Sequence, residues 1–212
     1  SLAHLGVLFL DELPEFNKEI LELLRIPLED GKITISRINS SILYPSQFML
    51  VASMNPCPCG YYGSNIHECT CSQQAISKYM NRVSGPLLDR IDIQIQVQNL
   101  KYEKLQNNNS ETSNQIRKRV TQARLIQLNR YKNESIFFNS ALTPKLIERY
   151  CKIDNESKKI LELAFNKLGL SARAYSRILK VARTIADLDK KKNIEKSHVI
   201  EAISYRSLDK RN

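Results

Sequence analysis

The stretch GVLFLDELPEF, at residues 6–16, decides how this chain folds. It begins with an uninterrupted apolar run of strand length, which is typical of a strand buried on both faces of a parallel sheet. Two carboxylates, Asp11 and Glu12, follow directly. Ligands of open α/β sheets bind beyond the carboxyl ends of the strands, so these acids are well placed for chemistry. Pro14 then ends the strand and favours a helix start near residues 15–17.

Four apolar residues followed by Asp-Glu form the Walker B pattern of nucleotide-hydrolysing proteins. In that pattern Asp11 would help to hold the magnesium ion of a bound nucleotide. Glu12 would be the general base that polarises the attacking water. The alternative interpretation is structural: a buried strand followed by the acidic start of a helix.

Composition indicates a soluble globular protein. The chain has 212 residues, enough for one large or two small domains. Its hydrophobic and charged contents, 42% and 25%, are those of ordinary soluble domains. No apolar run approaches the roughly 20 residues of a membrane span. Asp11 and Glu12 interrupt the early apolar run, which argues against a signal peptide, so we expect a cytoplasmic protein.

Positive charge is concentrated in the second half of the chain. Residues 1–100 hold 7 Lys/Arg and 10 Asp/Glu, a net charge of −3, whereas residues 101–212 hold 25 and 12, a net charge of +13. This excess favours a polyanionic partner, with nucleic acid the first candidate. The alternative is a solvated helical surface in a Lys-rich composition, because the sequence has no block of five like charges.

The sequence predicts an α/β part at residues 1–100 and an all-helical part at residues 101–212. In the first part we expect a helix ended by Gly31, a β-hairpin, two further strands and a second helix. These elements are placed at residues 17–28, 32–37 with 41–44, 48–54, 91–97 and 72–82, respectively. In the second part the apolar spacing predicts helices at residues 113–132, 144–150, 155–168, 172–188 and 195–204.

Two polar residues near the predicted strands are candidates for a catalytic site. Asn55 ends the second buried strand and could orient an attacking water beside the carboxylates; by itself, Asn-Pro after a strand more often marks a turn. Arg90 lies in SGPLLDRID, at residues 84–92. At a helix end it could neutralise charge on the γ-phosphate of a neighbouring subunit. The alternative for Arg90 is a local ion pair with Asp89 or Asp92.

Four of the five cysteines lie in one loop with the spacing C-x-C-x9-C-x-C: Cys57, Cys59, Cys69 and Cys71. Disulfides are disfavoured in the cytosol, so a structural zinc ion held by four thiolates is the preferred interpretation. The alternative is four free thiols, because paired zinc ligands usually have two residues between them and here have one. The fifth, Cys151, is interpreted as a thiol in a helical core.

Taken together, GVLFLDELPEF, the hairpin, LVASMNPCPCG and SGPLLDRID closely resemble magnesium-chelatase-like AAA+ ATPases of the ComM/YifB type. LSARAYSRILKVARTIADL, at residues 170–188, resembles the helical lid of the same proteins. The resemblance implies a partial AAA+ P-loop NTPase sheet followed by a helical lid domain. It further implies the following roles: Walker B for Asp11 and Glu12, sensor 1 for Asn55, an arginine finger acting in trans for Arg90, and sensor 2 for Arg173.

The resemblance also implies an activity. Such proteins bind ATP and Mg²⁺ and assemble as hexameric rings, and the ComM type are DNA helicases that promote branch migration during natural transformation. The hairpin would project into the ring pore and touch single-stranded or branched DNA, with Lys32 and Arg37 as the candidate contacts. The same fold could instead serve a chelatase-type motor that remodels a protein partner for metal insertion.

The sequence departs from the family pattern in one respect. It has no glycine-rich loop ending in Gly-Lys-Ser/Thr, the Walker A loop that cradles phosphates. It also begins without Met, directly before a predicted strand. We therefore expect a fragment of a longer protein that does not hydrolyse ATP alone. A gene that truly began near Ser1 would favour a third function, a non-enzymatic zinc-stabilised DNA-binding module with merely structural acids.

Overall fold

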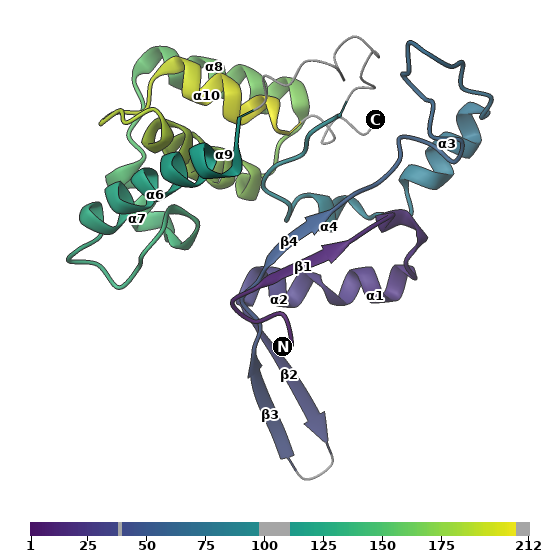
Figure 1. The fold of residues 1–212 in the computed structure, drawn as a ribbon, viewed down its shortest axis with the longest axis horizontal. Helices are drawn as coiled ribbons and strands as arrows, with labels where there is room; N and C mark the ends of the chain where they lie inside the picture. Colours follow the sequence, from purple (N-terminus) through teal and green to yellow (C-terminus); the bar gives the residue numbers. More distant parts are fainter. Residues whose placement is uncertain (38–39, 98–110, 207–212) are drawn as a thin grey trace. The chain divides into compact units, whose positions relative to one another are not determined.

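The computed structural model describes residues 1–37, 40–97 and 111–206 (Figure 1). These residues form two compact units. The first comprises residues 1–91 together with Val97, and the second comprises residues 92–96 and 111–206. The domain boundary predicted near residue 100 falls outside the described residues.

A pair of parallel strands organises the first unit. β1 (Val7–Leu10) pairs with β4 (Met49–Ala52), so that Val7 lies opposite Met49 and Leu10 opposite Ala52. The pairing continues past both strands, because Ser53 N–H donates to Leu10 O at 3.0 Å and Leu13 N–H donates to Ser53 O at 2.8 Å. The strand ends, and the polar residues that follow them, are therefore fixed side by side.

Helices α1 (Lys18–Leu23) and α2 (Arg25–Asp30) cover one face of this pair (Figure 1). The core beneath them joins Leu10, Leu13 and Leu21 to residues of the later helices, among them Leu87. The prediction of burial on both faces is wrong: Val7 and Phe9 are 61% and 59% exposed. The alternation of side chains along a strand turns these two away from the helices, and no described element covers them.

The helix predicted at residues 17–28 is broken at Leu24 into α1 and α2. The physical cause is Pro27, which has no N–H to donate to Leu23 O, four residues earlier. Gly31 ends α2 as predicted, at φ 65°, with its N–H bonded to Pro27 O at 3.0 Å. A Cβ there would lie 2.9 Å from Gln47 Cγ, so both the backbone angle and the space favour glycine.

The predicted hairpin is present. β2 (Lys32–Arg37) and β3 (Ser40–Pro45) are antiparallel, with Ile35 opposite Ile42. The base of the hairpin lies at the amino end of β1, because Leu5 N–H donates to Gln47 O at 2.6 Å. The hairpin projects away from the β1–β4 pair (Figure 1) and stands at the end of the sheet opposite to Asp11.

Three short helices complete the first unit: η1 (Leu13–Glu15), α3 (Gln73–Met80) and α4 (Gly85–Leu88). Ser72 caps α3 and Ser84 caps α4 through their side chains. The third strand predicted at residues 91–97 is wrong, since the structure has only an isolated bridge between Gln94 and Arg206. The alternation there is inverted: Gln94 is buried, whereas Ile93 and Ile95 are exposed.

The second unit is helical, as predicted. Its core gathers around α9, which buries Ala174, Ile178, Ala182 and Ala186 against the other helices. No helix among the described residues is long and apolar enough to cross a membrane. The elements are α6 (Ser113–Arg130), η2 (Asn139–Ala141), α7 (Pro144–Tyr150), α8 (Asn155–Leu168), α9 (Ala172–Leu188) and α10 (Lys196–Ser204).

A buried polar network ties α6 and η2 to α9. Asp187 is 1% exposed and accepts from Arg130 Nη1 at 2.8 Å and from Arg183 Nε at 3.2 Å. Asn139 Nδ2 donates to the same carboxylate at 2.9 Å, and Tyr131 Oη donates to Asn139 Oδ1 at 2.6 Å. The single carboxylate therefore pairs with two guanidinium groups in the interior, and Arg183 also donates to Lys191 O and Lys192 O.

We expect Asp187→Ala to lower the free energy of unfolding by about 3–5 kcal/mol, because it leaves two arginines buried without their counter-charge. Urea unfolding followed by circular dichroism at the helical band measures the change. Exposed Glu148 of α7 supplies the control: Glu148→Gln should stay within about 0.5 kcal/mol of the parent. Equal stability of the two variants would contradict the importance of the network.

Candidate functional site

The carboxyl ends of β1 and β4 form a polar edge. Asp11 follows β1, and Ser53 and Asn55 follow β4. Ser53 Oγ donates a hydrogen bond to Asp11 Oδ1, so the Asp11 carboxylate turns toward the strand that carries Asn55. Asp11, Glu12 and Asn55 are all exposed. Exposed carboxylates suit a hard cation such as Mg²⁺, which takes oxygen ligands.

Glu12 has a strained backbone. Its φ and ψ are both 51°, in the left-handed region, which costs a residue with a side chain about 1–2 kcal/mol. Two hydrogen bonds offset this cost, from Glu12 N–H to Asp11 Oδ1 at 3.1 Å and to Ser53 Oγ at 3.3 Å. Strain of this kind concentrates at functional sites, where the surroundings hold a side chain in a particular direction.

Ser53 bonds to both acidic residues of the edge, although the sequence did not mark it as a site residue. A signal was present: in LVAS the apolar run of the second strand changes to a hydroxyl two residues before Asn55. Only the register, Leu10 opposite Ala52, shows that this hydroxyl reaches Asp11.

Helix α3 packs against the same edge. Tyr79 lies beside the backbone of Asn55. Burial and the nearby charge of Glu15 raise the pKa of its hydroxyl and outweigh the effect of that backbone, which lowers it. Arg82, just beyond α3, donates from Nη1 to Glu15 Oε2 at 2.9 Å and to Pro14 O at 3.3 Å. The helix therefore holds both chain segments that leave the β1–β4 pair.

Arg90 is 8% exposed. Its guanidinium forms an ion pair with Glu29 at the end of α2, and Nη1 donates to Pro86 O at 2.8 Å. The sequence suggested Asp89 or Asp92 as local partners and did not suggest Glu29. To reach a phosphate of a neighbouring subunit, Arg90 would have to exchange Glu29 for it.

The other candidate residues belong to other elements. Arg173 is exposed in the first turn of α9, which Ser171 caps. One turn later, Arg177 forms an ion pair with Asp92 at 2.5 Å. Lys32 is exposed at the start of β2, and the side chain of Arg37 lies outside the described residues.

The four clustered cysteines meet as predicted from their spacing. Their Sγ atoms all lie within 4.8 Å of one another. Cys57 Sγ is 3.4 Å from Cys59 Sγ and 3.7 Å from Cys69 Sγ, and Cys59 Sγ is 3.6 Å from Cys69 Sγ. Tetrahedral zinc with Zn–S bonds of about 2.3 Å sets its sulfurs about 3.8 Å apart. The donor set therefore fits one zinc ion, and His67 is not needed as a ligand.

The thiols of this cluster differ in acidity. A hydrogen bond from the backbone N–H of Tyr61, aided by Cys57, lowers the pKa of Cys59 to about 6. The Cys71 backbone acts in the same direction on Cys69, but desolvation and the neighbouring thiols outweigh it and raise the pKa of Cys69 to about 12. Cys151 is buried in the helical core, as predicted, and burial raises its pKa to about 11.

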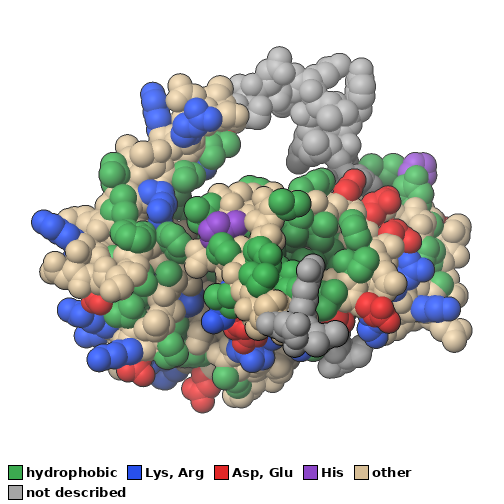
Figure 2. Space-filling view, turned by 90° about the horizontal axis from the view of Figure 1, so that it is seen from below, with side chains coloured by type: hydrophobic (Ala, Val, Ile, Leu, Met, Phe, Trp, Pro, Cys, Tyr) green, Lys and Arg blue, Asp and Glu red, His purple; other side chains and the backbone are tan. Residues whose placement is uncertain are grey.

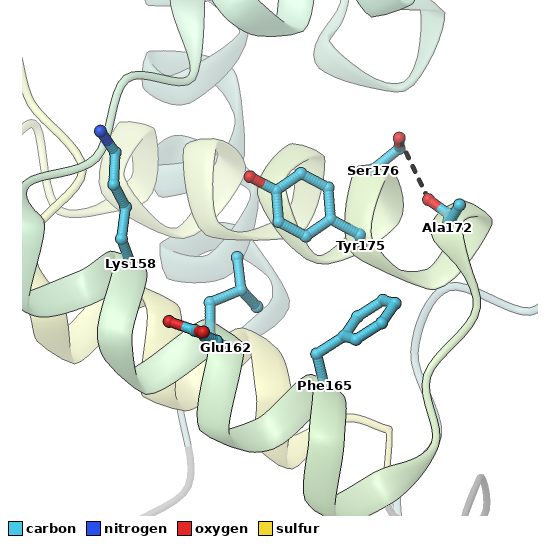
Figure 3. Close-up of a pocket in the computed structure, with 7 residues that line it drawn as sticks. Lys158, Glu162, Phe165, Ala172, Tyr175 and Ser176 are labelled. Carbon is cyan, nitrogen blue, oxygen red and sulfur yellow. Dashed lines mark hydrogen bonds between the residues drawn. The ribbon is translucent and has the colours of Figure 1, made fainter.

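A pocket of about 560 Å³ lies between α8 and the first turns of α9 (Figure 3). In this view the rings of Phe165 and Tyr175 face the same space. Ser176 Oγ donates to Ala172 O at 3.4 Å instead of pointing a free hydroxyl at a ligand. The pocket includes none of the predicted site residues, so it is not the candidate site.

Comparison with known proteins agrees with the fold. The family described as magnesium chelatase, subunit ChlI, matches residues 1–105, and its C-terminal domain matches residues 110–206. The chain belongs to this magnesium-chelatase-like AAA+ family, and the two units are a partial AAA+ fold and its helical domain.

Among its relatives is the competence protein ComM of Haemophilus influenzae, 50% identical over 98% of this chain. The uncharacterized protein YifB is 43% identical in Salmonella typhimurium and 44% identical in Escherichia coli, over 99% of this chain in each case. The chain spans only about 40% of the length of these relatives.

In reduced, metal-free protein, we expect iodoacetamide to label Cys59 much faster than Cys151 at pH 7. A thiol with a pKa near 6 is mostly thiolate at that pH, whereas a buried thiol with a pKa near 11 is not. The labelling rate of Cys59 should rise through pH 6 and level off by pH 8, as measured by peptide mass spectrometry. Equal rates, or a midpoint above pH 8, would contradict the assigned acidity.

Proposed function

We propose that this chain is the carboxyl-terminal part of an ATP-hydrolysing AAA+ ring motor that acts on DNA. The observation that carries the proposal is the edge where Asp11, at the end of β1, is held by Ser53, which lies between the end of the neighbouring β4 and Asn55. Family membership supports the ATPase class. One relative is named a competence protein, and this supports a role in DNA uptake or recombination.

Each residue of the edge has a distinct task in this proposal. Asp11 holds the magnesium ion of ATP, which supplies charge neutralisation at the phosphates. Glu12, aimed by its left-handed backbone, takes the proton of the attacking water. Asn55 orients that water through its amide. Because the chain contains no phosphate-binding loop, it would not turn over ATP without the rest of the polypeptide.

Two arginines would complete the site. Arg173 is exposed at the first turn of α9 and would act as sensor 2 on the bound nucleotide. Arg90 would act on the ATP of the next subunit in a hexameric ring, exchanging its pair with Glu29 for a phosphate. A trans contact of this kind would make turnover depend on ring assembly.

DNA is the proposed substrate, single-stranded or branched, with branch migration in natural transformation as the process and the cytoplasm as the setting. The hairpin projects from its unit with Lys32 exposed at its base, and Arg37 belongs to the same hairpin. In Figure 2, Lys and Arg side chains are scattered among other side chains rather than gathered in one patch. The proposed cofactors are ATP, Mg²⁺ and a structural zinc ion in the cysteine cluster.

A chelatase-type motor that remodels a protein partner is the second candidate. The observation in its favour is the apolar character of the hairpin, where Ile35, Ile42 and Leu43 are 46%, 45% and 58% exposed. Exposed aliphatic side chains suit a protein surface better than a phosphate backbone. DNA binding by the full-length protein distinguishes the two candidates.

In the full-length gene product, we expect Glu12→Gln to reduce ATP turnover about 100-fold or more while nucleotide binding persists, because the base is lost and the carboxylate of Asp11 remains. A phosphate-release assay measures turnover, and a fluorescent nucleotide measures binding. Glu19→Gln, on an exposed residue of α1, is the matched control and should hydrolyse ATP normally. Unchanged turnover in Glu12→Gln would refute the motor.

We expect Lys32→Ala to weaken DNA binding similarly for all sequences and to reduce the slope of log K against log salt by about 1, because one phosphate contact is lost. Fluorescence anisotropy with a branched oligonucleotide at several salt concentrations gives the slope. Lys18→Ala, at an exposed residue of α1, should leave this slope unchanged. Binding of a protein partner with no salt-dependent DNA binding would favour the chelatase-type motor.

A further inference from the structure

We infer that the cysteine cluster is a structural zinc site that braces the candidate catalytic edge through α3. The cysteine cluster consists of Cys57, Cys59, Cys69 and Cys71. The metal assignment stands independently of the proposed function, whereas the effect on turnover rests on it.

The sulfur geometry selects a single ion. The three closest Sγ–Sγ separations are 3.4–3.7 Å, and no pair among the four exceeds 4.8 Å. That spacing leaves room for one tetrahedral ion and not for a polynuclear iron–sulfur cluster. A disulfide would need a bond of about 2.0 Å, far shorter than these separations, and all four cysteines are free thiols.

The loop between the cysteine pairs depends on such an ion for its order. Residues 60–68 of this loop are mostly exposed, with Tyr61, Tyr62 and Ile66 at 42%, 46% and 54%. The buried member of the cluster is Cys57, at 0% exposure, whose Sγ also accepts a hydrogen bond from Tyr62 N–H at 3.3 Å. A loop with so few buried apolar side chains has little core of its own, and a metal ion supplies the missing free energy of folding.

The ion would link the segment after β4 to the start of α3, and both support the candidate catalytic edge. Cys57 lies two residues beyond Asn55, and Cys71 immediately precedes Ser72, whose Oγ accepts from Ala75 N–H at 3.2 Å and caps α3. A four-thiolate centre therefore fixes the start of α3 relative to the end of β4. The opposite end of α3 is fixed by Arg82 on Glu15.

The two anchors place Tyr79 against Asn55. Tyr79 is 7% exposed and lies beside the Asn55 backbone. If the metal is lost, the start of α3 is no longer fixed. Helix α3 is then held only at its opposite end, and both the Tyr79 contact and the Arg82–Glu15 pair are weakened. We therefore expect Asn55 and the segment after Glu12 to become mobile without zinc.

The first test is metal content. Full-length protein purified without chelator should contain about one zinc per chain by plasma mass spectrometry, and Cys69→Ser should lose most of it. Cys151→Ser, outside the cluster, is the matched control and should keep its zinc. Iron in place of zinc, four rapidly alkylated thiols in protein that has never met a chelator, or full zinc content in Cys69→Ser would each overturn the zinc site.

The second test is the brace, measured by hydrogen exchange so that it does not depend on ATP turnover. Removing zinc from the parent protein with a chelator should accelerate exchange in α3 and around Asn55, and adding zinc back should restore protection. Exchange in α9 serves as the internal control for global unfolding. Bound zinc whose removal leaves α3 and Asn55 equally protected would overturn the brace.

ATP turnover supplies a third reading. If the motor proposal holds, zinc removal should reduce turnover at least several-fold, and zinc addition should restore it. Turnover that is unaffected by loss of zinc would overturn the coupling between the two sites. Absence of turnover in the parent protein would refute the motor alone, because zinc content and exchange are measured without ATP.

Discussion

The parallel pairing of β1 with β4 is the constraint on which the candidate site depends. Asp11 belongs to one strand end, and Ser53 and Asn55 belong to the other. The register sets Leu10 opposite Ala52, and the hydroxyl of Ser53 then reaches the Asp11 carboxylate. A shift of one residue in either strand would turn its side chains to the opposite face and separate these groups. The chemistry proposed here therefore follows from backbone hydrogen bonds.

The cysteine loop and α3 make that edge firm. Polar side chains that follow a strand are held loosely unless something packs behind them, and here α3 does so through Tyr79 and Arg82. Because the loop that connects β4 to α3 has little apolar core, a bound metal ion would supply the free energy that fixes its path. The thiolate cluster thus begins only two residues beyond Asn55 of the candidate edge.

The second unit is a helical domain that is held together in part by a polar network in its interior. Asp187 pairs with both Arg130 and Arg183 inside the core; Asn139 donates to the same carboxylate, and Tyr131 donates to Asn139. Because α9 carries both this network and Arg173 at its first turn, the network holds the helix that would present sensor 2 to a nucleotide. Buried charges of this kind destabilise a protein strongly when one partner is removed.

The sequence by itself determined the helices of the second unit, the hairpin, the acidic strand end and the thiol cluster, because each is encoded by local periodicity, turn residues or spacing. Tertiary structure alone decided the rest. The loss of the strand predicted at residues 91–97 depends on how segments pair. The partner of Arg90, Glu29, lies 61 residues away, and the contact of Ser53 with Asp11 spans 42, so no local pattern could reveal either.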